Sequence, residues 1–163
     1  MKNIAIVLHT NSGHTLKFAQ AIRDKLVALG HEVDLLGLRI AGSATPGFMF
    51  IPGAGGGRFT IKSPPEVTGY DVILVGGPVW MFKASPVIMR YLAEDLPVIK
   101  GKKALSFATL LFRGGARALR MMNDELETSG ADVLEGEALR YFMKFNEAEL
   151  VAAVDRICER VTS

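Results

Sequence analysis

The sequence contains a single cysteine, Cys158, among its 163 residues. One cysteine can form neither an internal disulfide nor a cysteine-based zinc site, which excludes a disulfide-stapled secreted domain. No run of about 20 consecutive apolar residues is available to span a membrane. The strand-like segment Ile4–Leu8 follows Met1 almost directly, a pattern that predicts no signal peptide and a cytoplasmic protein.

Charged residues are balanced and dispersed, with 19 Lys and Arg against 17 Asp and Glu. The longest basic cluster, Lys100–Lys103, is typical of a solvated turn, so we expect no nucleic-acid partner. No Ser/His/Asp arrangement and no His/Glu spacing stands out, and we therefore expect neither a catalytic side chain nor a metal. Because 49% of the residues are hydrophobic, intrinsic disorder is excluded.

Short apolar runs alternate with longer segments of helical period. The runs predict buried strands at residues 4–8, 33–38, 72–75, 104–110 and 132–139. The periodic segments predict helices at residues 14–29, 86–95 and 115–128, and a last helix that begins after Asn146. This alternation predicts one α/β domain over residues 1–163, with a doubly wound, five-stranded parallel sheet.

Residues 41–69 break the pattern, since they hold seven of the 17 glycines and four of the seven prolines. This composition predicts a long loop with at most a short helical turn, and loops of this length are usually functional or mobile. Phe48 or Phe50 could close over a ligand from this segment, or could simply cover the sheet.

The segment Thr10–Thr15 lies between the first predicted strand and the first predicted helix. Backbone N–H groups at a helix N-terminus bind anions, and three hydroxyls and Gly13 would help here. The segment has no lysine of a Walker loop and no nucleophilic cysteine, so we expect it to bind a phosphate without transferring it. An ordinary capped turn is the alternative. The neighbouring His9 and the loop's His14 could each bind a ligand or face solvent.

The segment Gly76–Pro86, after the third predicted strand, combines Trp80, Met81 and Phe82 on an expected loop. Loops are normally polar, and these side chains would suit a planar ring system. A satellite core cluster is the alternative. A third loop, residues 109–115, leaves the fourth predicted strand in the same way.

All three loops follow the carboxyl ends of strands, where open α/β sheets bind their ligands. In the strand order 2-1-3-4-5, the first and third strands flank the point where the strand order reverses, and FMN binds there in proteins of that order. Phosphate donors on one loop and aromatic side chains on the other match the two ends of FMN.

The sequence resembles the flavodoxin-like flavoproteins over its whole length. Thr10, Gly13, Thr15 and Ala19 match the family's phosphate-loop pattern, and residues 70–80 resemble its second flavin segment. The resemblance implies that the first loop binds the phosphate, the second frames the isoalloxazine ring and the third completes its pyrimidine side. The cofactor-binding residues implied in this way are Thr10, Asn11, Ser12, Gly13, His14, Thr15, Pro78, Val79, Trp80, Met81, Phe82, Lys83, Thr109, Leu110, Leu111, Phe112, Gly114 and Gly115.

The resemblance leaves two activities open. Flavodoxins that shuttle electrons are usually strongly acidic around the flavin, whereas Lys83 and Arg113 stand on two of these loops. Basic residues favour an anionic reduced flavin, so we expect an FMN-dependent NAD(P)H oxidoreductase that passes electrons to a quinone or a similar small acceptor. Arg58, Lys62 and Arg113 are candidate contacts for NADPH.

A one-electron carrier serving a redox protein partner is the alternative to this enzyme. A scaffold that keeps the fold without flavin is a third reading. Dimerisation would cover Met81, Phe82 and the glycine-rich segment.

Overall fold

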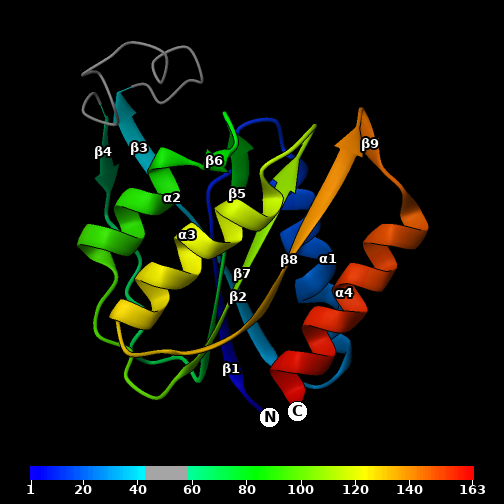
Figure 1. Cartoon of the computed structure of the whole chain (residues 1–163). Coiled ribbons are helices and arrows are strands. Elements are labelled where there is room, and N and C mark those ends of the chain that lie inside the picture. Colours follow the sequence, from blue (N-terminus) through cyan, green and yellow to red (C-terminus); the bar gives the residue numbers. More distant parts are fainter. Residues whose placement is uncertain (43–58) are drawn as a thin grey trace.

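The computed structural model describes residues 1–42 and 59–163, and a parallel sheet forms its centre (Figure 1). The five parallel strands are β1 (Asn3–Leu8), β2 (Glu32–Gly37), β5 (Val72–Trp80), β7 (Lys103–Leu110) and β8 (Asp132–Phe142). They lie in the order β2-β1-β5-β7-β8, each parallel to its neighbours. The predicted α/β class and the predicted strand order 2-1-3-4-5 are confirmed.

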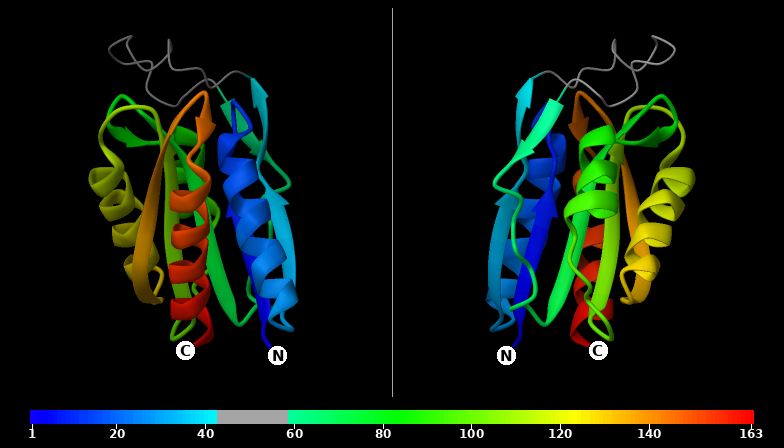
Figure 2. Two further views of the ribbon diagram at one scale, coloured as in Figure 1. Left: turned by 90° about the vertical axis from the view of Figure 1, so that its right-hand side faces the viewer. Right: turned by 90° about the vertical axis from the view of Figure 1, so that its left-hand side faces the viewer.

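Helices cover both faces of this sheet (Figure 2). α1 (His14–Ala28) and α4 (Glu147–Thr162) pack on one face. α2 (Pro86–Arg90), which continues as a π-helical turn, and α3 (Gly115–Thr128) pack on the other. None of the helices in the described ranges is both long enough and apolar enough to cross a membrane.

Successive side chains of the strands contribute to two hydrophobic cores, one on each face of the sheet, as β1 illustrates. Its Ile4 and Ile6 pack against Phe18 of α1, whereas Ala5 and Val7 face the opposite helix layer. Successive side chains of a strand point to opposite faces, so an unbroken apolar run buries both of them. This is the physical reason that the continuous apolar runs identified the central strands.

Two helix starts follow their predicted caps. The Ser85 hydroxyl accepts a hydrogen bond from the N–H of Val87 at 3.2 Å, and Pro86 occupies the first helical position of α2. The Asn146 side chain accepts from the N–H of Glu149 at 3.1 Å at the start of α4. Both caps satisfy amides that the first helical turn leaves without a partner.

β5 is longer than predicted, and this corrects the expected loop at residues 76–80. The strand continues to Trp80, and β6 (Lys83–Ala84) then pairs back against it. Gly76 lies inside the strand, and glycine is required there because the Phe107 ring occupies the space that a Cβ would fill. The glycine that suggested a chain break is a packing requirement of the sheet.

β8 is also longer than predicted and ends in a hairpin. It continues past Leu139 to Phe142, and β9 (Lys144–Phe145) pairs back antiparallel. The register against β7 supports the extension, since Leu110 pairs with Arg140. The extension carries Tyr141 to the carboxyl end of the sheet.

The expectation of a loop throughout residues 41–69 is wrong at residues 41–42 and 59–62, which belong to strands, whereas residues 63–69 form no helix or strand. β3 (Arg39–Gly42) and β4 (Phe59–Lys62) form an antiparallel pair beside the main sheet. Phe59 is buried beneath the Arg90 guanidinium, which also donates a hydrogen bond to the Phe59 carbonyl. These tertiary contacts hold β4 in place, and its Phe59, Thr60 and Ile61 are residue types that favour strands. The lid role considered for Phe48 and Phe50 and the role considered for Arg58 lie outside the described residues.

Candidate functional site

A cavity of about 500 Å³ opens at the carboxyl end of the sheet. The loops after β1, β5 and β7 all contribute to it, so Ser12 and Trp80 line one cavity. Its lining consists of Asn11, Ser12, Pro78, Val79, Trp80, Met81, Phe82, Leu110, Leu111, Phe112, Arg113 and Tyr141. Most of this wall is apolar, and its polar side chains are Asn11 and Ser12 of the first loop, Arg113 of the third loop and Tyr141 of β8.

The first loop presents the start of α1 without a side-chain cap. Gly13 is the N-cap residue, with φ of 88°, a left-handed conformation that glycine adopts readily. The Gly13 N–H is held by the Thr10 hydroxyl at 3.2 Å. Within residues 1–42 and 59–163, the N–H groups of His14 and Thr15 have no acceptor. The loop therefore keeps amides of the first helical turn available to an anion.

The hydroxyl of Thr15 joins two loops. It lies 2.8 Å from the hydroxyl of Thr109, and both side chains are buried. A buried hydroxyl needs a partner, so each threonine satisfies the other. These two predicted site residues hold the first loop against the end of β7, and their hydroxyls do not line the cavity.

His14 fastens the first loop to the β8–β9 hairpin. Its Nε2 lies 3.0 Å from the carbonyl oxygen of Met143, and its ring stacks on Tyr141 with centroids 3.6 Å apart. A carbonyl only accepts hydrogen bonds, so Nε2 carries the hydrogen. In a neutral ring Nδ1 then accepts from the Ser12 hydroxyl, which lies 2.7 Å away.

His9 neither faces solvent nor points freely toward a ligand, contrary to both interpretations of the sequence. Its ring is buried, with Nδ1 2.7 Å from the Ser85 hydroxyl. The ring meets Trp80 edge-on at a centroid distance of 5.5 Å. Burial lowers the pKa of His9 from 6.5 to about 4, so the imidazole is neutral at physiological pH. His9 supports the wall of the cavity from behind.

The second loop is a two-residue turn in an unusual conformation. Met81 and Phe82 have φ of 51° and 64°, although neither is glycine. Such residues cost about 1–2 kcal/mol each in the left-handed region, and strain of this kind clusters at functional sites. The turn leaves both side chains about half exposed at the mouth of the cavity.

The third loop packs directly against the second. Gly114 has φ of 100°, and a Cβ at this position would lie 2.5 Å from the Cα of Phe82. Glycine is required here on both grounds. Phe112 stands 73% exposed beside this contact, so the loops present an apolar rim.

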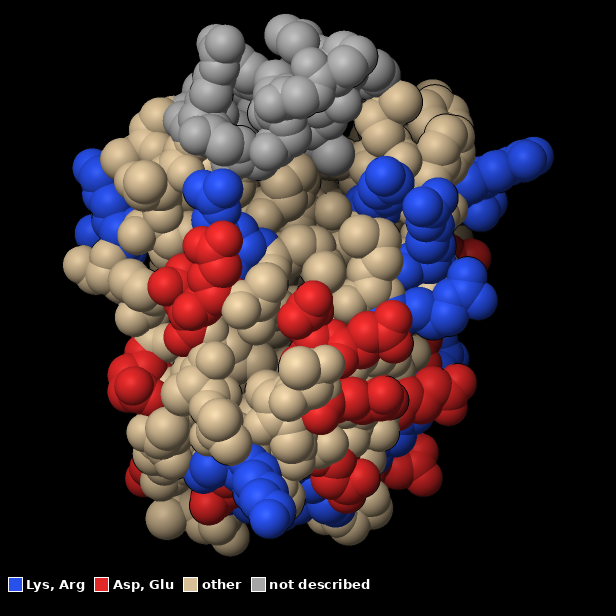
Figure 3. Space-filling model, turned by 60° about the vertical axis from the view of Figure 1, so that its left-hand side comes forward, with Lys and Arg blue, Asp and Glu red and all other residues tan. Residues whose placement is uncertain are grey.

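Positive charge borders the cavity. Arg113 lines it, and Lys83 is exposed beside the second loop. Among the described residues, no Asp or Glu side chain lines this cavity. Figure 3 shows the same trend on one face of the molecule, where basic side chains gather near the loop end and most acidic side chains lie farther down.

Solved structures with the same architecture are flavodoxins and flavoproteins. Oxidised flavodoxin 2 from Bacillus cereus matches with a TM-score of 0.71 at 21% identity, over 98% of this chain and 97% of its own. A flavodoxin from the domain Archaea gives 0.70 at 18% identity, over 98% and 99%. A flavoprotein from Lactobacillus acidophilus NCFM, solved in complex with FMN, gives 0.59 at 18% identity, over 85% and 93%. The chain has the flavodoxin-like fold. No protein-family model and no curated protein matches the sequence.

Several predicted site residues of this flavodoxin-like chain lie outside the cavity lining. Thr10, Gly13, His14 and Thr15 shape the first loop around the start of α1, and Thr109 anchors it. Lys83 belongs to β6, and Gly114 supports Phe82. Gly115 lines a neighbouring cavity.

Tyr141 lines the cavity although the sequence analysis did not identify it. The signal was present in the sequence, because alternation continues past Leu139 through Arg140 and Tyr141. Within the described ranges, no group of three His, Cys, Asp or Glu side chains is placed to hold a metal ion.

Proposed function

We propose that this chain binds FMN non-covalently in the cavity and acts as an oxidoreductase. The observation that carries the proposal is that Ser12 and Trp80 line one cavity, and that Ser12 immediately precedes the uncapped start of α1. An anion-binding end and an apolar slot match a phosphorylated planar coenzyme. The FMN complex of the Lactobacillus acidophilus flavoprotein, which has the same fold, supports this assignment.

The residues present fit that cofactor chemically. The amides of His14 and Thr15 would bind the phosphate, because neither has an acceptor within residues 1–42 and 59–163. Trp80, Leu111 and Phe112 would enclose the ring system and exclude water. Bound FMN would supply redox chemistry that no side chain of this chain offers.

The basic rim favours hydride chemistry over electron shuttling. Arg113 and Lys83 would stabilise negative charge on a reduced ring, and no carboxylate among the lining residues would oppose them. We therefore propose that the enzyme takes a hydride from NADH or NADPH and reduces a quinone or a similar small acceptor.

Steady-state turnover tests this activity. The purified, FMN-loaded protein mixed with NADPH or NADH and a benzoquinone should oxidise the nicotinamide continuously without another protein. Reduction of the bound flavin should occur at one two-electron potential. Two well-separated one-electron steps, with no turnover of either nicotinamide, would contradict the enzyme assignment.

A one-electron carrier is the second candidate, and the exposed apolar rim favours it. Phe112, Phe82 and Met81 are 73%, 52% and 46% exposed, and such side chains commonly mark protein contacts. A carrier would exchange electrons rapidly with a redox protein partner, while NADPH alone would leave its flavin oxidised.

A second copy of the chain could instead cover the same apolar rim. Analytical ultracentrifugation would reveal such a dimer.

A further inference from the structure

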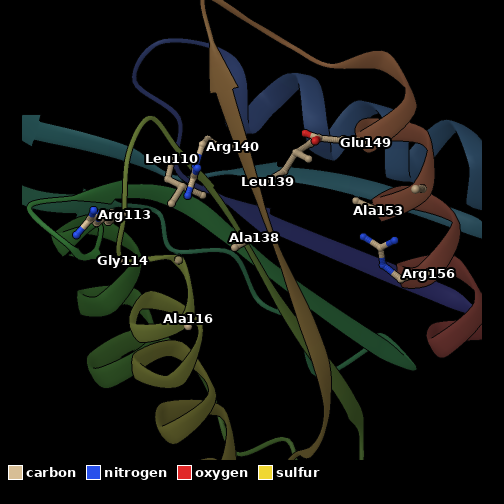
Figure 4. A pocket seen from close by; sticks show the side chains of 12 residues that line it. Leu110, Arg113, Gly114, Ala116, Ala138, Leu139, Arg140, Glu149, Ala153 and Arg156 are labelled. Atoms are coloured by element: carbon tan, nitrogen blue, oxygen red, sulfur yellow. The ribbon is translucent and has the colours of Figure 1, made fainter.

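A second cavity, of about 660 Å³, adjoins the first at the edge of the sheet (Figure 4). It lies between the start of α3, the end of β8 and the first turns of α4. We call it the arginine groove, and it is lined by Leu110, Arg113, Gly114, Gly115, Ala116, Ala138, Leu139, Arg140, Glu149, Ala152, Ala153 and Arg156. Its volume suits a small ligand of nucleotide size.

Two of its three arginines have no counter-charge. Arg156 is bound by the Glu137 carboxylate at 2.8 Å and 3.0 Å. Within the described part of the chain, Arg113 and Arg140 form neither an ion pair nor a hydrogen bond. Figure 4 shows both on the side of β8 that faces the loop after β7, with Leu110 between them. A single guanidinium group can bind a phosphate in a bidentate manner.

Small residues create the space beside these arginines. Ala116, Ala138, Ala152 and Ala153 leave the floor open. Gly115 keeps α3 close to β8, since a Cβ there would lie 2.8 Å from the Cβ of Ala138. The start of α3 has no side-chain cap, so its first amides add to the positive end of the groove.

Glu149 supplies the opposite chemistry at the other side of the groove. Its carboxylate projects from α4 toward Leu139, on the side where Arg156 also lies (Figure 4). A carboxylate accepts hydrogen bonds and would repel a phosphate, but it suits the hydroxyls of a ribose. The groove thus pairs an anion-binding end with a hydroxyl-binding end, as a nucleotide requires.

The arginine groove communicates with the proposed flavin cavity. Leu110 and Arg113 line both cavities. A ligand with its phosphates at Arg113 would therefore lie next to the wall formed by Leu111 and Phe112. Among small redox ligands, a nicotinamide dinucleotide combines a reacting ring with a diphosphate and ribose.

We propose that the arginine groove binds the diphosphate and a ribose of the nicotinamide hydride donor. Arg113, Arg140 and the first amides of α3 hold the diphosphate, and Glu149 accepts hydrogen bonds from the ribose. This inference rests on the proposed function, because it locates the donor of that reaction. It also predicts a binding property that does not depend on turnover.

Calorimetric titration of the FMN-loaded protein with adenosine 5′-diphosphate tests the groove directly. The substitutions Arg113→Gln and Arg140→Gln should each weaken binding about tenfold, a loss of about 1.4 kcal/mol. Arg120→Gln is the matched control, because Arg120 is an exposed arginine of α3 outside the groove and its loss should change nothing. Glu149→Gln should weaken binding of adenosine diphosphate but not of inorganic pyrophosphate.

Steady-state kinetics supply the second readout. Arg140→Gln should raise the KM for the nicotinamide about tenfold and leave the KM for the quinone unchanged. If Arg113→Gln and Arg140→Gln bind the nucleotide as tightly as Arg120→Gln does, the arginine groove is not the nucleotide site. This conclusion would hold even if the enzyme turns over. Arginine-dependent nucleotide binding without any flavin reduction would support the groove and contradict the proposed hydride transfer.

Discussion

At the scale of single residues, His9 shows how a buried polar group is accommodated behind the site. Its Nδ1 pairs with the Ser85 hydroxyl, which also caps α2 through the N–H of Val87. One serine therefore serves a helix and a histidine at once. Because the ring lies in an apolar setting beside Trp80, its charged form is disfavoured and its pKa falls to about 4.

This lowered pKa predicts that the free energy of unfolding decreases as the pH is lowered from 6.5 to about 4. Above pH 6.5 His9 is neutral in both the folded and the unfolded chain, so it contributes no pH dependence. Below pH 6.5 the unfolded chain binds a proton that the folded chain refuses until about pH 4. The free energy of unfolding should therefore drop by about 3 kcal/mol between these pH values, as measured by denaturant titration.

The variant His9→Asn isolates this contribution. Asparagine keeps a polar group near Ser85 but does not titrate, so the variant's stability should depend less steeply on pH between 6.5 and 4. Parallel pH profiles for the two proteins would show that His9 is not responsible.

At the scale of elements, the loops of the cavity are held by one another. Thr15 bonds to Thr109 between the first loop and β7, and Gly114 lies against the backbone of Phe82 between the second and third loops. His14 stacks on Tyr141 and ties the first loop to the β8 hairpin. The cavity wall is therefore a set of mutual contacts, and a change in one loop moves its neighbour.

The substitution Gly114→Ala tests this coupling. Its Cβ would meet the Phe82 backbone, so the second loop must shift and FMN affinity should fall at least tenfold. Gly30→Ala is the matched control, since Gly30 has φ of 87° with open space around it. Both variants should lose about 1–2 kcal/mol of stability from backbone strain, measured by denaturant titration. Equal FMN affinities in the two variants would contradict the loop contact.

The sequence was sufficient for those elements whose burial has a strong local pattern. The apolar runs at Ile4–Leu8 and Val72–Val75 predicted central strands, and the stripe Ile22, Leu26 predicted a buried face of α1. Caps at Ser85 and Asn146 marked helix starts through side-chain chemistry that acts locally. The predicted site loops meet around one cavity because strand order alone brings their ends together.

Features that depend on contacts between residues far apart in the sequence could not be predicted from local sequence patterns. Gly76 suggests the end of a strand when only the sequence is considered. In the structure it is a strand residue, and it is glycine because the Phe107 ring fills the space of a Cβ. β4 is held by the Arg90 contact with Phe59, residues far apart in the chain. Arg140 lines the same groove as Arg113 because β8 extends alongside β7, a pairing between segments that are distant in the sequence.

At the scale of the whole molecule, the two ends of the sheet differ in character. The carboxyl end carries exposed apolar side chains, among them Phe112, Phe142 and Met143, and also Arg113 and Arg140, which have no ion-pair partner within residues 1–42 and 59–163. The amino end holds the two termini (Figure 1), where Lys2 donates to the carbonyl of Val161 at 2.7 Å. Both proposed ligand sites therefore lie at the carboxyl end of the sheet, away from the two termini.

The central claim is that the loops after β1 and β5 bind one FMN together. Trp80 is the single tryptophan of the chain and lines the cavity, so its emission reports on that site. Titration of the flavin-free protein with FMN should quench this emission and saturate at one FMN per chain. Emission from Trp80 that stays unchanged in excess FMN would contradict the account.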